Sequence, residues 1–272
     1  MVKSFFAFLL FASICFGYDL NSNLKSIVGD QVYNANRQKI KSLFINEAEF
    51  LDTNLNLNYD KITNILRTNS FLNLSYASPV YMDISFVSSS SPTLVLKAIS
   101  QSLNNLGYNY FLTKSLDTWD SGMVWSISVN TQFMLNPGSF YKELLSNNIF
   151  IKNIKKTGQF AYSYEIDASR AMLKTLTYES DTEVQLSKPL EPYFLNVSGK
   201  SSIEIKSRSN DSWIALVKIL DKNLKLISQV KSDKKEKEIY LNFPDEAFYL
   251  IIDDVFSLEN IKHGLTIYIK SN

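Results

Sequence analysis

The sequence VYMDISFV, Val80 to Val87, opens the stretch that decides the fold, which continues to Asp167. Its apolar residues recur with the period of two that lets a β-strand bury one face. A serine run follows and ends at Ser91-Pro92, which predicts a helix start, because a hydroxyl residue caps a first turn well and proline is tolerated there. The next apolar residues recur at helical spacing as far as Gly107, where a left-handed residue is expected to end the helix: Leu96, Ile99, Leu103 and Leu106.

Two strands and a second helix are expected after Gly107. Residues 108–113 form one predicted strand and residues 123–129 the other, with residues 114–122 as their connection. Asn136-Pro137-Gly138 repeats the cap-and-proline pattern, and an apolar stripe follows it before the Asn147-Asn148 pair. This pattern predicts a short second helix.

A hairpin completes the stretch. Residues 149–154 and the alternating residues 160–166 are its predicted strands, with a turn at residues 155–158. The order of elements is then strand, helix, strand, strand, helix, strand, strand. This order predicts a ferredoxin-like split β-α-β sandwich with an extra edge strand, in which two helices cover one face of an antiparallel sheet.

The C-terminal third of the chain has an all-strand pattern. Polar turns such as Asn210-Asp211 and Asp221-Lys222-Asn223 separate short apolar runs. The predicted strands are residues 183–186, 193–197, 202–207, 213–220, 224–231, 237–243, 248–253 and 265–270. About eight strands in so short a segment predict an antiparallel β-sandwich or jelly roll.

The residues before Pro79 have a helical pattern. Leu24, Ile27 and Val28 indicate a first short helix, and Asn58 is expected to cap a later one. An amphipathic arm of this kind packs either on its own domain or on another protein, and the pattern leaves both open. The fold class is therefore α+β, divided into a signal peptide (1–17), a helical arm (18–78), a ferredoxin-like domain (79–167), a linker (168–182) and a β-sandwich domain (183–272).

The first residues resemble a cleavable export signal. Met1-Val2-Lys3 is a short basic start, residues 5–16 are an apolar run too short to span a bilayer, and Gly17 precedes a predicted cleavage site. A lipoprotein acylated at Cys15 is the competing interpretation. Because Cys15 is the only cysteine, cleavage after Gly17 leaves a mature protein without disulfides, thiolate metal sites or cysteine nucleophiles. We therefore expect a periplasmic protein with no membrane span in its mature chain.

Composition and charge restrict the classes of partner. The chain is 45% hydrophobic and 20% charged, which is typical of a globular rather than a disordered protein. Without Lys3 of the signal, 27 basic residues face 27 acidic ones. This balance does not favour nucleic acid or an anionic membrane as a partner.

Few residues suggest catalysis or metal binding. His263 is the only histidine, so any imidazole chemistry depends on a residue that is more simply an exposed loop histidine. Carboxylates gather at Asp253-Asp254 with Glu259, at Asp245-Glu246 and at Glu165 with Asp167, without the spacing of a known calcium loop. Asp253-Asp254 is the best calcium hypothesis among them, but we expect no catalytic residue, no metal site and no cofactor.

Tryptophans are the best candidates for partner contact. Trp125 and Trp213 fall in strand patterns and are most simply core residues. Trp119 lies in the polar connection and, with Asp120, is the predicted contact, because an exposed indole anchors interfaces or stacks on sugars.

Three segments resemble a group of exported proteins of polar-flagellated epsilon-class bacteria. They are Asn58-Tyr59-Asp60-Lys61-Ile62, LNNLGYNYFL at residues 103–112, and the run from Leu135 to Tyr141, and the resemblance covers about residues 36–167. No activity or residue role comes with it. Because these bacteria build large periplasmic scaffolds, including disks around the flagellar motor, the resemblance implies a place in such an envelope complex.

Three functions remain after these observations. The first is a non-catalytic scaffold or assembly protein that binds other envelope proteins, as a homo-oligomer or ring component if it binds itself. The second is a glycan- or peptidoglycan-binding protein that uses the C-terminal β-sandwich. The third is a hydrolase that depends on the carboxylates.

Overall fold

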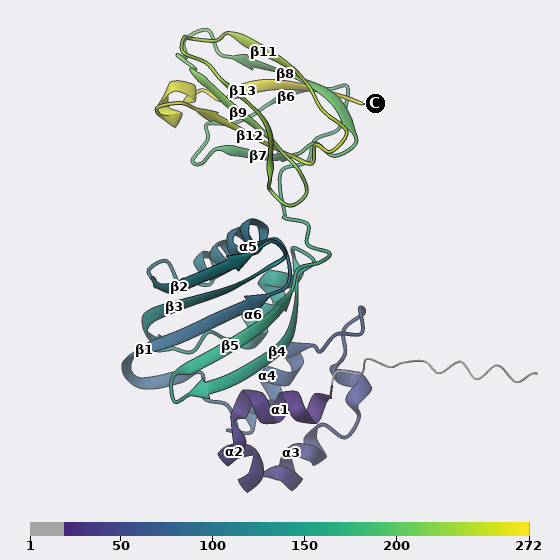
Figure 1. Ribbon diagram of the computed structural model, residues 1–272, viewed down its shortest axis with the longest axis vertical. Helices are drawn as coiled ribbons and strands as arrows, with labels where there is room; N and C mark the ends of the chain where they lie inside the picture. Colours follow the sequence, from purple (N-terminus) through teal and green to yellow (C-terminus); the bar gives the residue numbers. More distant parts are fainter. Residues whose placement is uncertain (1–18, 272) are drawn as a thin grey trace, which may run out of the picture.

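A computed structural model describes residues 19–271, and the predicted signal peptide lies outside them. These residues form a mixed α+β fold with six α-helices and thirteen strands in three sheets (Figure 1). No helix in this part of the chain is long and apolar enough to cross a membrane.

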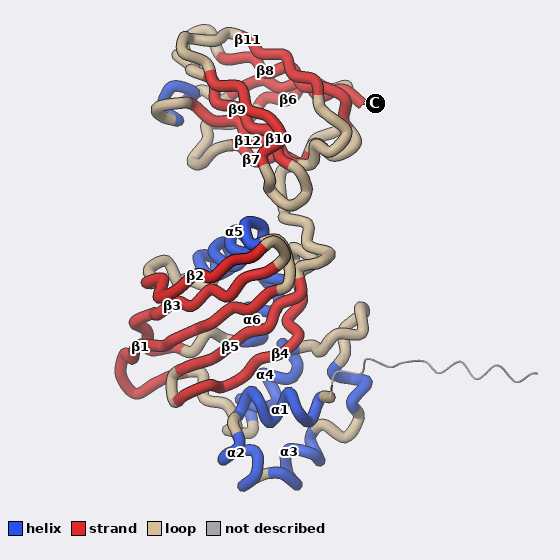
Figure 2. The backbone as a smooth tube through the Cα atoms, viewed as in Figure 1, coloured by secondary structure: helices blue, strands red, loops and turns tan. Residues whose placement is uncertain are grey.

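The first sheet has five strands in the order β2-β3-β1-β5-β4. Their bounds are β1 Ser75–Ser88, β2 Leu112–Trp119, β3 Gly122–Phe133, β4 Phe150–Gly158 and β5 Ala161–Asp167. Two helices, α5 (Pro92–Asn105) and α6 (Pro137–Leu145), lie on one face of this sheet (Figure 2). The two predicted helices, and their place on a single face, are therefore confirmed.

One strand pair differs from the predicted antiparallel sheet. β5 lies between β1 and β4, pairs antiparallel with β4, and runs parallel to β1. The hairpin turn also comes later than expected, because β4 continues through residues 155–158 before the chain reverses. The extra strand is thus inserted inside the sheet at β5, and β4 becomes the edge.

The helix-covered face of this sheet is closed by aromatic packing. Phe86 of β1 lies with its ring centroid 5.7 Å from those of Trp125 and Phe140, and 5.9 Å from that of Tyr164. All four side chains are buried. Burying a side chain of this size contributes about 1.5–3 kcal/mol to stability. Phe86, one of the alternating apolar residues of VYMDISFV, therefore lies at the centre of this core.

The two helix starts on this face are capped differently. Asn136 accepts hydrogen bonds from the backbone N–H groups of Gly138 and Ser139, as expected of a capping residue. Ser91 does not cap α5 with its side chain, and its hydroxyl instead donates to the carbonyl of Asn223 at 3.1 Å. The predicted Ser91 cap is therefore wrong, while Gly107 does follow the helix with a φ of 89°.

Strand β2 is displaced from its predicted position. We expected a strand over residues 108–113 and a loop to Gly122, but the strand covers Leu112–Trp119 and turns at Asp120-Ser121. Every residue of β2 is exposed, so neither face selects apolar side chains and no period of two can form. A strand of this kind looks like a polar loop in sequence.

The N-terminal helices pack on the first sheet of their own chain. They are α1 (Leu20–Val28), α2 (Asp30–Ala35), α3 (Arg37–Leu43), the 3-10 turn η1 (Glu47–Phe50) and α4 (Tyr59–Thr68). Their buried residues belong to the same hydrophobic cluster as the sheet and its two helices. Asn58 caps α4 by accepting from the N–H of Lys61, as predicted. The arm thus contributes to the core of its own chain.

The C-terminal residues form two four-stranded antiparallel sheets. The strands are β6 Glu183–Gln185, β7 Tyr193–Asn196, β8 Lys200–Ser207, β9 Ala215–Leu220, β10 Leu226–Lys231, β11 Glu238–Asn242, β12 Tyr249–Asp254 and β13 Leu265–Ser271, with a 3-10 turn η2 at Leu258–Ile261. One sheet has the order β10-β9-β12-β7 and the other β11-β8-β13-β6. Both contribute to a second hydrophobic cluster, in which Trp213 is fully buried and donates its indole N–H to the carbonyl of Asp253.

Candidate interaction surface

One edge of the first sheet is uncovered. β2 pairs with β3 on one side, and no strand within residues 19–271 pairs with its other side. Three large apolar side chains of this edge are exposed: Leu112 (71%), Leu116 (45%) and Trp119 (49%). An exposed edge with apolar side chains is a ready template for an added strand.

The opposite edge of the same sheet is protected. α1 packs against β4, and the buried hydroxyl of Tyr59 donates to the carbonyl of Lys152 on that strand at 3.2 Å. β4 also carries Lys155 and Lys156, and lysines along an edge discourage pairing with another chain. The two edges therefore differ, and β2 is the one left open.

The single lysine of β2 is neutralised. The ammonium group of Lys114 lies 2.7 Å from a carboxylate oxygen of Asp83, across the uncovered face of the sheet. The hydrogen bond from Lys114 lowers the pKa of the Asp83 carboxyl. Because this pair is internal to the sheet, the charge of Lys114 is balanced before any partner arrives.

The two predicted contact residues lie at the β2–β3 hairpin. The indole of Trp119 covers Gly122, since a methyl group placed on Gly122 would meet the ring at 2.4 Å. The ring is thus held by the hairpin while about half of its surface stays exposed. Asp120 is exposed in the turn beside it. Trp119 therefore ends the open edge as a positioned aromatic side chain.

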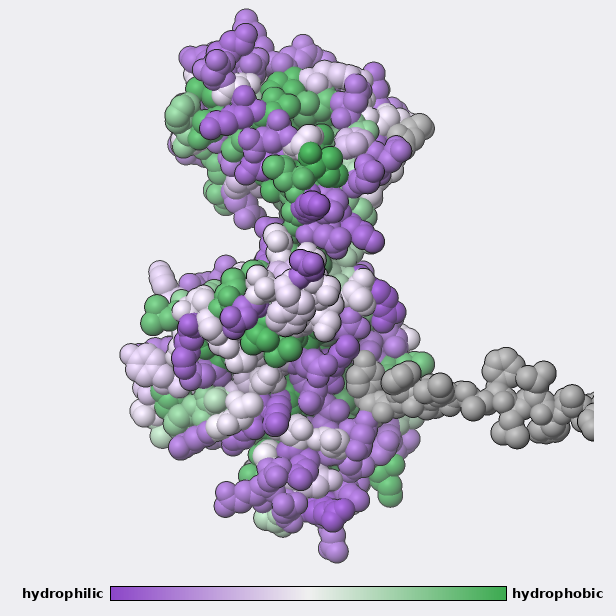
Figure 3. All heavy atoms as spheres, in the orientation of Figure 1, coloured by the Kyte–Doolittle hydropathy of each residue, from purple (hydrophilic) through white to green (hydrophobic). Residues whose placement is uncertain are grey.

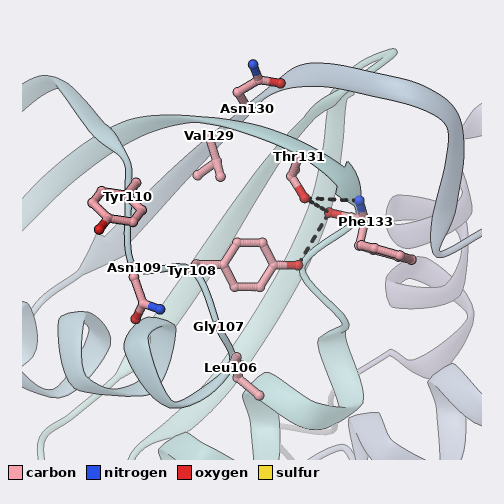
Figure 4. Close-up of a pocket in the computed structure, with 9 residues that line it drawn as sticks. All are labelled: Leu106, Gly107, Tyr108, Asn109, Tyr110, Val129, Asn130, Thr131 and Phe133. Carbon is pink, nitrogen blue, oxygen red and sulfur yellow. Dashed lines mark hydrogen bonds between the residues drawn. The ribbon is translucent and has the colours of Figure 1, made fainter.

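A groove lies at the other end of β2 (Figure 4). It is formed by the loop after α5, which supplies Tyr108 and Tyr110, and by the end of β3, which supplies Asn130, Thr131 and Phe133. Its volume is about 320 Å³. Figure 3 shows hydrophobic residues, in green, at the surface of this part of the molecule among polar ones. Sequence reasoning missed the groove because its two sides come from different elements.

The only histidine is engaged with a carboxylate. The Nδ1 atom of His263 lies 2.6 Å from Oδ1 of Asp211, and about half of the imidazole is exposed. Asp211 also accepts, at 3.4 Å, from the backbone N–H of His263. This pair joins the turn after β8 to the loop before β13.

Asp254, part of the best calcium hypothesis, organises a loop instead. One of its oxygens accepts from the N–H groups of Phe256 and Ser257 and from the amide of Asn260, and the other accepts from the N–H of Ile214. Burial alone would raise the pKa of this carboxyl, but these hydrogen bonds outweigh it and lower the pKa. Both oxygens are therefore used by the protein.

The remaining carboxylates stay apart from one another. Glu259 pairs with Lys188 at 2.7 Å, and Asp245 and Glu246 are exposed in a turn. Glu165 is exposed on β5, whereas Asp167 accepts from the N–H of Ser169 at 2.9 Å. Within residues 19–271, no three His, Cys, Asp or Glu side chains gather in a way that could hold a metal ion.

Comparison with known proteins found no matching family model, no matching curated protein and no matching solved structure.

Proposed function

We propose that this protein is a non-catalytic, exported scaffold or assembly protein that binds another envelope protein along β2. The observation that supports it is the open edge, where eight consecutive exposed residues include Leu112, Leu116 and Trp119. The place of action within this proposal is the periplasm, in a complex such as the disk around a polar flagellar motor. Within this proposal, the first sheet and its two helices are a ferredoxin-like split β-α-β unit, and the two C-terminal sheets are a β-sandwich or jelly roll.

The physical basis is strand addition. An extended segment of the partner forms backbone hydrogen bonds with the free N–H and C=O groups of β2, and its alternate side chains contact the exposed apolar residues. Leu116 faces the helix-covered side of the sheet, since it pairs with the buried Trp125, whereas Trp119 lies over Gly122 on the opposite side. A bound strand would thus find an apolar contact on each face.

The two edge strands of the first sheet, β4 and β2, are not equally accessible to a partner strand. A partner strand at β4 would have to displace α1 and approach Lys155 and Lys156. At β2 it would meet one lysine that is already paired with Asp83. Binding at β2 therefore needs no rearrangement of the core.

The test is recovery of the complex from the periplasm of the cells that make the protein, with wild-type and variant chains. Leu116→Lys with Trp119→Lys places two charges on the open edge and should abolish recovery of the partner. Leu190→Lys, at an exposed position in a loop before β7, is the matched control and should retain it. Hydrogen exchange on the recovered complex should then show new protection of β2 amides. Equal recovery with both variants, or protection confined to the C-terminal sheets, would contradict the proposal.

Self-association is a separate outcome of the same preparation. Sedimentation of the purified chain distinguishes a partner protein from a second copy bound at β2. A dimer that dissociates in the Leu116→Lys, Trp119→Lys variant would identify the strand donor as another copy of this chain.

A further inference from the structure

The groove of Figure 4 contains no charged residue. The residues that form it are Leu106, Gly107, Tyr108, Asn109, Tyr110, Val129, Asn130, Thr131 and Phe133. A second hollow of about 210 Å³ continues from it and shares Leu106, Tyr108 and Phe133 with it. The second hollow adds Leu74, Met134, Asn136 and Ser139, which are also uncharged. In a chain that is 20% charged, the two hollows form a continuous uncharged surface.

The floor of the groove is fixed by three hydrogen bonds. The hydroxyl of Tyr108 donates to the carbonyl of Phe133 at 3.3 Å, and the hydroxyl of Thr131 donates to the same oxygen at 3.1 Å. The N–H of Phe133 in turn donates to Thr131 at 3.0 Å. Burial, with a smaller contribution from Tyr76, raises the pKa of Tyr108 to about 12, so its hydroxyl stays protonated near neutral pH.

The rim carries aromatic rings with no structural role in the core. Tyr110 is 92% exposed and Phe133 is 61% exposed. Tyr81 of β1 is also largely exposed, and it pairs across the strands with Asn130. Rings that are left so exposed contribute little to folding, because they bury little apolar surface.

Two side-chain amides lie beside the groove. Asn109 comes from the loop after α5 and Asn130 from β3, and Figure 4 shows the amide of Asn130 pointing away from Tyr108. Neither side chain hydrogen-bonds to another residue within the described range of 19–271. Each amide is therefore free to donate two hydrogen bonds and to accept others.

We infer that this groove binds an uncharged oligosaccharide. The apolar C–H face of a sugar ring packs on an exposed aromatic ring, while its hydroxyls exchange hydrogen bonds with amides and hydroxyls. An apolar peptide would leave the amide of Asn109 unpaired beneath it, which is costly once water is excluded. A charged sugar would find no counter-charge among the lining residues. Strand addition at β2 and sugar binding in the groove are independent, since different residues carry them.

The experiment is calorimetric titration of the full chain with two neutral probes, tetra-N-acetylchitotetraose and cellotetraose. At least one of them should bind, and Tyr110→Ala and Phe133→Ala should each weaken that binding about tenfold through the loss of one stacking surface. Phe256→Ala, which removes an exposed ring after β12, is the matched control and should leave the affinity unchanged. Tyr110 is so exposed that its loss should not alter folding, which a thermal melt checks.

Three outcomes would overturn the inference. The first is that neither probe binds at millimolar concentration. The second is that Phe256→Ala and Tyr110→Ala lose the same amount of binding affinity. The third is that an anionic tetragalacturonate binds more tightly than both neutral probes. Each of them leaves the proposal for β2 untouched, because that proposal depends on recovery of a protein partner.

Discussion

The backbone N–H of Leu173 donates a hydrogen bond to the hydroxyl of Tyr249 at 2.9 Å. Leu173 follows the first sheet in sequence, whereas Tyr249 begins β12, so this bond joins the two halves of the chain. Tyr249 is fully buried, stacks on Phe194 with centroids 5.0 Å apart, and belongs to the first hydrophobic cluster despite its place in a C-terminal strand. Lys97 of α5 lies over the same Phe194 ring at 5.0 Å. The junction is therefore a packed contact.

Replacing Tyr249 with Phe tests this junction. The ring stays, but the buried N–H of Leu173 loses its acceptor, which should cost about 1–3 kcal/mol of unfolding free energy. Urea unfolding followed by circular dichroism measures it. Tyr81→Phe is the control, since it removes a hydroxyl from a largely exposed side chain and should cost little. An unchanged unfolding midpoint in Tyr249→Phe would show that the Leu173 bond contributes nothing to stability.

Gly122→Ala should displace the indole of Trp119. The added methyl group would lie 2.4 Å from the present ring position, so the ring must move away from the hairpin. Trp125 and Trp213 are buried, and a red shift in tryptophan emission would therefore report on Trp119. The change in stability should be about 1 kcal/mol and should shrink in a Trp119→Ala background, as expected of residues in contact. Additive effects of the two substitutions would argue against the contact.

All eight predicted strands from Glu183 onward correspond to strands of the structure. Those with a buried face, β7, β8, β9, β12 and β13, must alternate, which makes them recognisable in sequence. β10 is almost wholly exposed and was recognisable only by the polar turns around it. β2 could not be placed in the same way, because both of its faces are exposed and its sequence LTKSLDTW has no such constraint. Trp119 was therefore predicted as a contact residue, but in a loop rather than on a strand edge.

The groove and the Asp254 loop depend on distant partners. Tyr110 and Phe133 line the same groove only because of the way β3 pairs with its neighbours, and this register is not apparent in the sequence around either residue. Similarly, the pair Asp253-Asp254 resembles a calcium ligand in sequence. The N–H groups that occupy Asp254 cannot be recognised from the sequence, because one of them comes from Ile214, forty residues earlier. Spacing alone could not distinguish a metal ligand from a loop-organising carboxylate.

Tyr59→Phe should loosen the N-terminal helices. The hydroxyl of Tyr59 is fully buried, and its one hydrogen is shared between two acceptors, Oδ1 of Asn23 on α1 at 2.9 Å and the carbonyl of Lys152 on β4 at 3.2 Å. Its removal leaves those acceptors without this donor and should cost about 1–2 kcal/mol. Hydrogen exchange should show the loss in α1 first. Tyr33→Phe, which removes a weaker 3.3 Å bond to Asn21, is the control. Protection of α1 equal to that of wild type would contradict the proposed role of Tyr59.

Asp254→Asn should destabilise the protein in a pH-dependent way. The pKa of Asp254 is lower in the folded chain than in the unfolded chain, where it is about 3.9. Its charged form therefore stabilises the fold fully above the unfolded pKa, and this contribution is lost as the pH falls through the folded pKa. At pH 7 the substitution should cost about 2–3 kcal/mol, because hydrogen bonds to a charged acceptor are replaced by weaker ones. The difference in unfolding free energy between variant and wild type should narrow below about pH 4. Asp233→Asn, at an exposed turn, is the control and should leave the unfolding free energy unchanged both at pH 7 and below about pH 4. A difference in unfolding free energy for Asp254→Asn that does not change with pH would contradict the role of its charge.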